Sequence, residues 1–191
     1  MIDFLYSIDV SVFYFINHTF SNPLFDKFFP FITEVKNWYL VYAIFWLILM
    51  IKGGKRGRIA AIGILLLITV SDQISSSLIK NLVERIRPCN ALPDVNILAG
   101  CTGSFSFPSS HAVNNFAFAV FFSKLYPRFK VPFYIIAVLT AFSRPYVGVH
   151  YPSDIIAGAL IGSLIGYLFG ILALYIDNKF PQIKLFKKNE N

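Results

Sequence analysis

The run NWYLVYAIFWLILMI at residues 37–51 decides the fold class, because nearly every side chain in it is apolar and Lys52 follows directly. A helix that crosses the hydrocarbon core of a bilayer needs about 20 mostly apolar residues. Further apolar blocks, separated by basic or Gly/Pro-rich segments, follow at residues 58–79, 110–126, 131–144 and 154–176. We therefore predict an all-α fold, a polytopic membrane helical bundle in which these five blocks are spans.

The composition excludes a soluble domain of this size. Only 14% of the 191 residues are charged and 56% are hydrophobic, whereas soluble domains carry about 25% charged residues. The net charge of +7 does not indicate a nucleic-acid partner, because Lys and Arg gather in short clusters between the apolar blocks. We expect one membrane-embedded domain over residues 1–191, surrounded by the lipid bilayer, with no protein partner evident.

The N-terminal segment, residues 1–35, allows two interpretations. Residues 4–20 are rich in Phe, Tyr, Ile and Val, so they form either a short or tilted sixth span or an amphipathic helix in the membrane interface. We favour the span, which gives about six transmembrane helices. The core helices then occupy residues 37–177, and residues 178–191 form a cytoplasmic tail.

The basic residues predict the orientation. Most of the 17 lie in the loop after residue 51, in the loop around residues 124–130 and in the tail, which share one face if the five spans alternate. Loops rich in Lys and Arg stay in the cytoplasm. Four basic residues lie in or beside segments of the opposite face: Lys80, Arg85, Arg87 and Arg144. Ionisable groups at membrane depth are functional candidates, so these four need another explanation.

Three short segments meet at this non-cytoplasmic face. They are KNLVERIRP at residues 80–88, FPSSH at residues 107–111 and SRPYVGVHYPSD at residues 143–154. Arg offers a bidentate fork for phosphate oxygens. The backbone N–H groups of a helix that begins at Ser109-Ser110 point outward, as in other phosphate sites at helix N-termini. The three segments therefore predict a site for a phosphate group.

The same segments hold the side chains that phosphate chemistry needs. His150 and Asp154 suit a nucleophile or base with its orienting carboxylate. His111 is then left as general acid, because imidazole titrates at about 6.5. Metal ions that act on phosphate usually bind several carboxylates or a compact His cluster. Only Glu84 accompanies Asp154 as an acid in these segments, so we expect neither a metal nor another cofactor.

These residues resemble the signature of the type 2 phosphatidic acid phosphatase superfamily, which reads K-x6-R-P, P-S-G-H and S-R-x5-H-x3-D. The matching positions are Lys80, Arg87, Pro88, Pro108, Ser109, His111, Ser143, Arg144, His150 and Asp154. Ser110 replaces the usual Gly of the second motif. This departure matters little if the backbone N–H of Ser110 is the group used, and it matters if the position requires a positive φ.

The resemblance implies a lipid phosphatase of a bacterial inner membrane, built as a helical bundle with its site at the non-cytoplasmic end. It implies that His150 attacks phosphorus, Asp154 holds its tautomer, and His111 protonates the leaving oxygen and then activates water. The residues implied to bind the phosphoryl oxygens are Lys80, Arg87, Ser109, Ser110 and Arg144.

The small size and short outer loops look most like short bacterial members, including lipid A 1-phosphatases. The candidate substrates that the family implies are lipid A 1-phosphate, undecaprenyl diphosphate, phosphatidylglycerol phosphate and phosphatidic acid. Two alternatives stay open: phosphoryl transfer to an acceptor other than water, and a non-catalytic protein that binds or transports lipid or phosphate. A transporter is expected to have paired repeats or broken helices at the midplane, and the sequence has none.

Three polar features remain beside these motifs. Cys89 and Cys101 both lie in the outer loop, where oxidising conditions favour a disulfide, with free thiols as the alternative. Arg85 is interpreted as a cation that extends to the interface, so Arg85→Ala should keep much of the activity. Asp72 is interpreted as a polar contact between helices.

Overall fold

The apolar run at residues 37–51 forms most of helix α3, Tyr39–Lys52, in the computed structural model, which describes residues 2–180. The other four blocks form α4 (Gly54–Asp72), α7 (Ser110–Leu125), α8 (Lys130–Tyr146) and α9 (Pro152–Lys179). All five are therefore confirmed as helices. Of the predicted tail, residues 181–191 lie outside the described residues.

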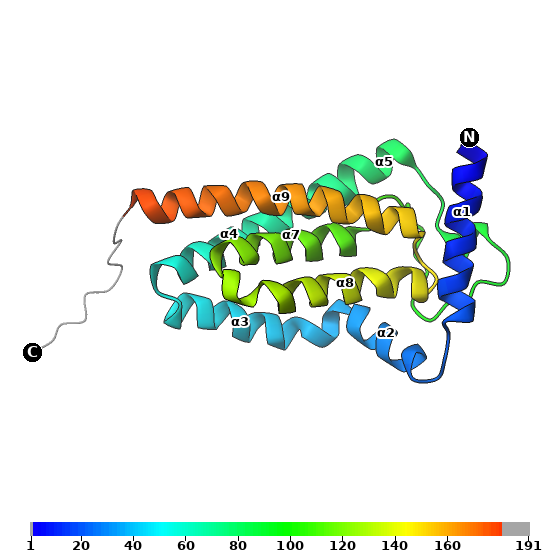
Figure 1. The fold of residues 1–191 in the computed structure, drawn as a ribbon, viewed down its shortest axis with the longest axis horizontal. Coiled ribbons are helices and arrows are strands. Elements are labelled where there is room, and N and C mark those ends of the chain that lie inside the picture. The colour runs from blue at the N-terminus through cyan, green and yellow to red at the C-terminus, as the bar shows by residue number, and fades with distance from the viewer. Residues whose placement is uncertain (1, 181–191) are drawn as a thin grey trace, which may run out of the picture.

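Helix α7 lies at the centre of the bundle. It packs against α4, α8 and α9, and α3 pairs with α4 (Figure 1). Phe121 and Phe122 of α7 are completely buried, and they form a core cluster with Leu67 of α4 and Ala173 of α9. The second motif, residues 107–111, thus lies at the start of a helix that is held on several sides.

The contact between α7 and α9 depends on glycines spaced by four residues along α9. A Cβ added at Gly162 would lie 2.1 Å from the Val113 carbonyl oxygen, and one added at Gly166 would lie 2.3 Å from that of Ala117. Small residues allow helix backbones to approach closely in membranes, where apolar burial does not drive helices together. The helices that carry His111 and Asp154 can therefore pack closely, because glycine has no side chain to keep their backbones apart.

The second apolar block continues beyond α4. A π-helix, η3 (Gln73–Ile79), leads into α5 (Lys80–Val83), which ends where Glu84 adopts a left-handed conformation with φ 52°. A short non-helical segment then leads to α6 (Pro88–Ala91). This path places both ends of the first motif, Lys80 and Arg87, at one end of the bundle.

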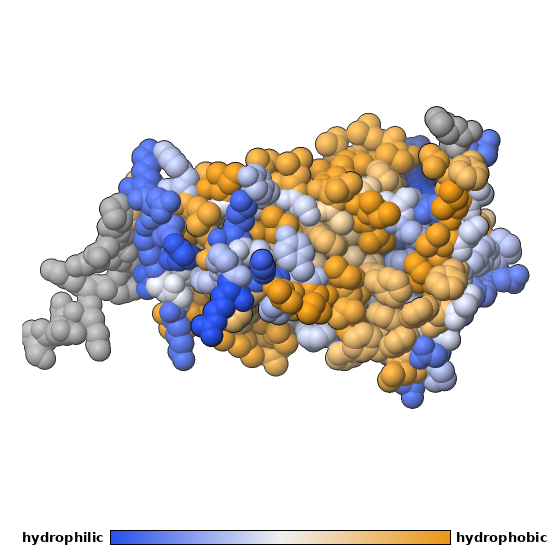
Figure 2. Space-filling view, viewed as in Figure 1, coloured by the Kyte–Doolittle hydropathy of each residue, from blue (hydrophilic) through white to orange (hydrophobic). Residues whose placement is uncertain are grey.

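The surface is that of a membrane protein. Figure 2 shows an apolar belt along the visible face, with hydrophilic residues gathered toward the two ends of the bundle. Among the described residues, the helical stretches long and apolar enough to cross a bilayer are Val35–Lys52, Gly54–Ala91 and Pro152–Lys179. Helices α7 and α8 are shorter, with 16 and 17 residues. The fold is an all-α membrane helical bundle.

The N-terminal segment does not run along the bundle. Residues 4–20 lie in α1 (Ile2–Tyr14) and the π-helix η1 (Phe15–Thr19), and α1 crosses the end of the bundle at a steep angle to α8 and α9 (Figure 1). Two short elements, α2 (Phe25–Thr33) and η2 (Val35–Trp38), then lead to α3. Helix α1 therefore lies across the end of the bundle that carries the motifs and is not parallel to the five helices predicted as spans.

We predict that Gly162→Ala lowers the apparent midpoint of thermal unfolding in detergent, because the new methyl group meets the Val113 carbonyl oxygen at 2.1 Å and α9 must move away. Overpacking of this kind costs about 1–3 kcal/mol, which corresponds to about 2–12 °C for a chain of this size. Gly100→Ala is the control, because a Cβ there meets nothing within 4 Å. Equal midpoints for the two variants would contradict the packing account.

Candidate active site

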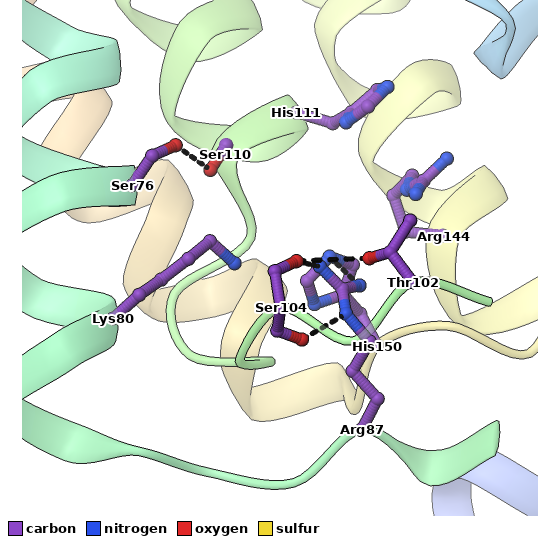
Figure 3. A pocket seen from close by; sticks show the side chains of 9 residues that line it. All are labelled: Ser76, Lys80, Arg87, Thr102, Ser104, Ser110, His111, Arg144 and His150. Atoms are coloured by element: carbon purple, nitrogen blue, oxygen red, sulfur yellow. Dashed lines mark hydrogen bonds between the residues drawn. The ribbon is translucent and has the colours of Figure 1, made fainter. Parts of the chain in front are cut away.

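A cavity of about 270 Å³ opens at the end of the bundle that carries the motifs (Figure 3). All three motif segments contribute to its wall. The residues that line it are Ser76, Lys80, Arg87, Thr102, Ser104, Ser110, His111, Arg144 and His150. Both motif histidines thus face one cavity together with the three motif cations.

His150 is held in one tautomer by its neighbours. Its Nε2 lies 3.0 Å from Nη1 of Arg87, and a guanidinium group has only donors. Nε2 therefore accepts with its lone pair, and the ring proton sits on Nδ1, which faces Oδ2 of Asp154 at 3.3 Å. This arrangement places the lone pair of His150 on Nε2, next to the guanidinium of Arg87.

The buried position of His150 keeps the ring neutral. Burial lowers the pKa of His150 to about 3, against an upward effect of the hydrogen bond to Asp154, and the charges of Arg87 and Arg144 lower it further. A neutral imidazole retains the lone pair that a nucleophile needs. At neutral pH His150 is therefore available for attack on an electrophile in the cavity.

Asp154 lies behind His150 and does not line the cavity. Its carboxylate is fully buried at the start of α9, where it accepts from the Tyr151 backbone N–H at 2.9 Å and the Ser106 hydroxyl at 2.5 Å. Arg85 donates to its other oxygen at 2.7 Å. Because buried charges need partners of this kind, the carboxylate is fixed relative to three separate segments.

The cations Lys80 and Arg87 also fix the outer loop. Lys80 donates to the Phe105 carbonyl oxygen at 2.6 Å, and Arg87 donates to the carbonyl oxygen and the hydroxyl of Ser104 at 2.7 and 2.9 Å. In the same loop, Cys89 and Cys101 are joined in a disulfide. The loop is thereby held against the mouth of the cavity.

Arg144 and His111 meet at the end of α2. Arg144 donates to the Thr33 hydroxyl at 2.7 Å, and Nε2 of His111 lies 3.2 Å from the Thr33 carbonyl oxygen. Figure 3 places both side chains on one side of the cavity, away from Arg87 and His150. Among the described residues, the buried Nε of Arg144 has no hydrogen-bond partner, and such donors are normally satisfied. It is a donor available to an anion.

The two serines of the second motif differ in position. Ser109 is fully buried, does not line the cavity, and caps α7 with its hydroxyl, which accepts from the Ala112 N–H at 3.5 Å. Ser110 lines the cavity, and its hydroxyl lies 3.2 and 3.0 Å from those of Ser75 and Ser76. Its φ is not positive, so the position does not require Gly. The Ser109 hydroxyl is thus occupied by helix capping.

Two interpretations of single residues need correction. Arg85 is not a cation extending to the interface, because it pairs with Asp154 at 2.7 Å and with Asp9 at 2.6 Å. The Asp72 carboxylate accepts from Ser76 one turn further along the same chain segment, at 3.1 Å. This contact is local, whereas a contact between helices was expected.

Several site residues were missed. Thr102 and Ser104 line the cavity, and Ser106 bridges His150 and Asp154. Serine and threonine in a loop carry no sequence signal, because they are common there. Asp9 did carry one, since an acid inside an apolar run is a functional candidate.

We predict that inorganic phosphate raises the apparent thermal midpoint of the protein in detergent, since an anion in the cavity meets Lys80, Arg87 and Arg144. A ligand at 100 times its Kd stabilises a protein by about 2.7 kcal/mol. The phosphate-dependent shift should be lost in Arg144→Gln and kept in Arg128→Gln, which alters an exposed cation. An unchanged shift in Arg144→Gln would contradict the anion site.

Comparison with known proteins gives a consistent result. Residues 61–183 match the profile of the PAP2 superfamily. The chain is 36% identical over 181 residues to the lipid A 4'-phosphatase of Bacteroides thetaiotaomicron. The aligned region covers 91% of this chain and 80% of that protein.

Two crystal structures share the fold. Aquifex aeolicus LpxE superimposes with a TM-score of 0.64 at 25% identity, over 87% of this chain and 94% of that one. A transmembrane PAP2-type phosphatidylglycerolphosphate phosphatase from Bacillus subtilis superimposes with a TM-score of 0.66 at 26% identity, over 96% and 89% of the two chains.

Proposed function

The chain belongs to the PAP2 superfamily and is a lipid phosphatase of that family, and we propose from this premise that it hydrolyses lipid phosphates through a phosphohistidine on His150. One observation carries the proposal. The His150 ring lines the same cavity as Lys80, Arg87 and Arg144, and its Nε2 carries the lone pair, which accepts from Arg87. A nucleophile and fixed positive charges around one space are what phosphoryl transfer requires.

In the first step Nε2 of His150 attacks phosphorus. The N–P bond forms as the bond from phosphorus to the lipid oxygen breaks. His111, which takes up a proton when the negatively charged headgroup binds, gives that proton to the lipid oxygen. In the structure Nη1 of Arg87 lies 3.0 Å from Nε2 of His150. When substrate binds, this N–H group leaves Nε2 and donates to a phosphoryl oxygen. The positive charge that develops on the ring is stabilised by Asp154 next to Nδ1.

In the second step water attacks the phosphohistidine. His111, neutral after the first step, takes a proton from the water while the N–P bond breaks and its electron pair returns to Nε2 of His150. Inorganic phosphate and the free histidine are the products. The same two histidines thus serve both halves of the reaction with their proton roles reversed.

The proposed mechanism uses no metal. Lys80, Arg87 and Arg144 offset the charge of the phosphoryl oxygens directly. Among residues 2–180 there is no group of three or more His, Cys, Asp or Glu side chains that could hold a metal ion. The donors around the cavity are therefore suited to an anion rather than to a cation.

We propose a lipid A phosphate as the substrate. The Bacteroides relative is a lipid A 4'-phosphatase, so the 4'-phosphate takes precedence over the 1-phosphate that the sequence suggested. Leu82 and Ile86 lie within the first motif segment, between Lys80 and Arg87, and are 74% and 60% exposed. Such a surface suits acyl chains that remain in the bilayer while the headgroup enters. Undecaprenyl diphosphate, phosphatidylglycerol phosphate and phosphatidic acid are the competing substrates.

We propose that the cavity opens on the periplasmic side of a bacterial inner membrane. Lys52, Lys55 and Arg56 lie at the turn between α3 and α4, at the opposite end of the bundle from the cavity (Figure 1). Positively charged loops face the cytoplasm. Helix α1, which crosses the cavity end, then lies in the outer interface rather than spanning the bilayer.

We predict that purified protein in detergent releases phosphate from lipid A with EDTA present. His150→Ala should lower this release by at least about 10³-fold, because the nucleophile is removed, and His111→Ala by about 10²–10⁴-fold, as expected for a general acid and base. Arg144→Ala should lose most activity as well. Released phosphate is measured against phosphatidic acid, phosphatidylglycerol phosphate and undecaprenyl diphosphate.

Arg128→Ala is the control for this series, because Arg128 is exposed and lies outside the motifs, between the C-terminal end of α7 and the start of α8. Loss of release on adding EDTA would contradict the metal-free mechanism. Near-normal turnover in His111→Ala or Arg144→Ala would contradict their roles, and binding of lipid without release would favour a non-catalytic protein.

A further inference from the structure

A chain of buried charges leads from α1 to the carboxylate behind His150. Nη2 of Arg85 lies 2.6 Å from Oδ2 of Asp9, and Nη1 lies 2.7 Å from Oδ1 of Asp154. The side chains of Asp9 and Asp154 are 9% and 0% exposed, and that of Arg85 is 20% exposed. Arg85 therefore bridges two carboxylates that lie far apart in sequence.

Further contacts hold the bridge in one geometry. Ser153 donates its backbone N–H to Asp9 at 2.9 Å and its hydroxyl to the same carboxylate, and it accepts from Arg85 at 2.7 Å. The Arg85 guanidinium lies 3.8 Å from the ring centre of Tyr151, a cation–π contact. The bridge is thus anchored to the loop that carries His150.

The bridge occupies one oxygen of Asp154 and leaves the other for catalysis. Arg85 binds Oδ1, whereas His150 faces Oδ2 at 3.3 Å. Rotation of the carboxylate would break the contact with Arg85, so the contact fixes the oxygen that orients the His150 ring. Contacts of this kind, made to the group that orients a catalytic side chain, keep a site in its productive geometry.

The bridge also sets the charge behind His150. Two carboxylates and one guanidinium carry a net charge of −1. Because Asp9 also pairs with Arg85, it partly offsets the positive charge that Arg85 exerts on Asp154. Without Asp9, Arg85 would act on Asp154 alone and weaken its effect on a positive ring. Without Arg85, Asp9 and Asp154 would be buried near each other with no cation between them, which is unfavourable.

We propose that Arg85 and Asp9 are positioning residues for the His150–Asp154 pair, so that helix α1 is a functional part of the active site. The proposal rests on the proposed role of His150 as nucleophile. It replaces the sequence-based expectation that Arg85→Ala keeps much of the activity.

The test compares kcat and KM for lipid A phosphate release by Asp9→Asn, Arg85→Gln and the double variant. Asp9→Asn should lower kcat by about 3–10-fold with KM unchanged. Arg85→Gln should lower kcat by more, because Arg85 pairs with Asp154 directly and its loss leaves both carboxylates without their cation. The double variant should be more active than Arg85→Gln alone, because it removes the unpaired carboxylate. Arg85→Lys should restore part of kcat.

Asp3→Asn is the matched control, because it makes the same change on an exposed residue of the same helix. A kcat for Asp9→Asn equal to that of Asp3→Asn would overturn the proposal. If Arg85→Gln fails to fold, the comparison of Asp9→Asn and Arg85→Lys with the control still decides. Full turnover by His150→Ala would instead overturn the proposed function, whatever the Asp9 variants do.

Discussion

A buried negative charge at the start of α9 organises the active site. The Asp154 carboxylate is fully buried, a position that is costly without partners. Its partners come from separate parts of the chain: the Tyr151 N–H before α9, the Ser106 hydroxyl in the outer loop and Arg85 after α5. Because one carboxylate binds all of them, the first and third motifs and the outer loop hold their relative positions.

Helix packing places this carboxylate next to the second motif. The backbone N–H of Ser109 donates to the Asp154 carbonyl oxygen at 3.1 Å, which joins the first turns of α7 and α9. The glycines of α9 allow the two helices to stay close over their length. His111 and His150 therefore reach one cavity because α7, which carries His111, is packed closely against α9, which begins directly after His150.

The sequence was sufficient for features that depend on local patterns. Apolar blocks predicted the five helices, and the residue types of the third motif predicted the pairing of His150 with Asp154. Contacts between distant segments were not predictable, because the path of the outer loop and of α1 decides them. Ser106 and Asp9 reach Asp154 and Arg85 in this way, and Ser109 looked like a phosphate ligand although its hydroxyl caps a helix.

The most direct measurement follows the phosphoryl group onto the enzyme. Protein mixed with labelled lipid phosphate is quenched in alkali, which preserves phosphohistidine, and the modified residue is located by mass spectrometry. The account predicts phosphate on Nε2 of His150, the ring nitrogen that carries the lone pair. Turnover with phosphate on a different residue, or with no phosphoenzyme on a timescale faster than turnover, would contradict it.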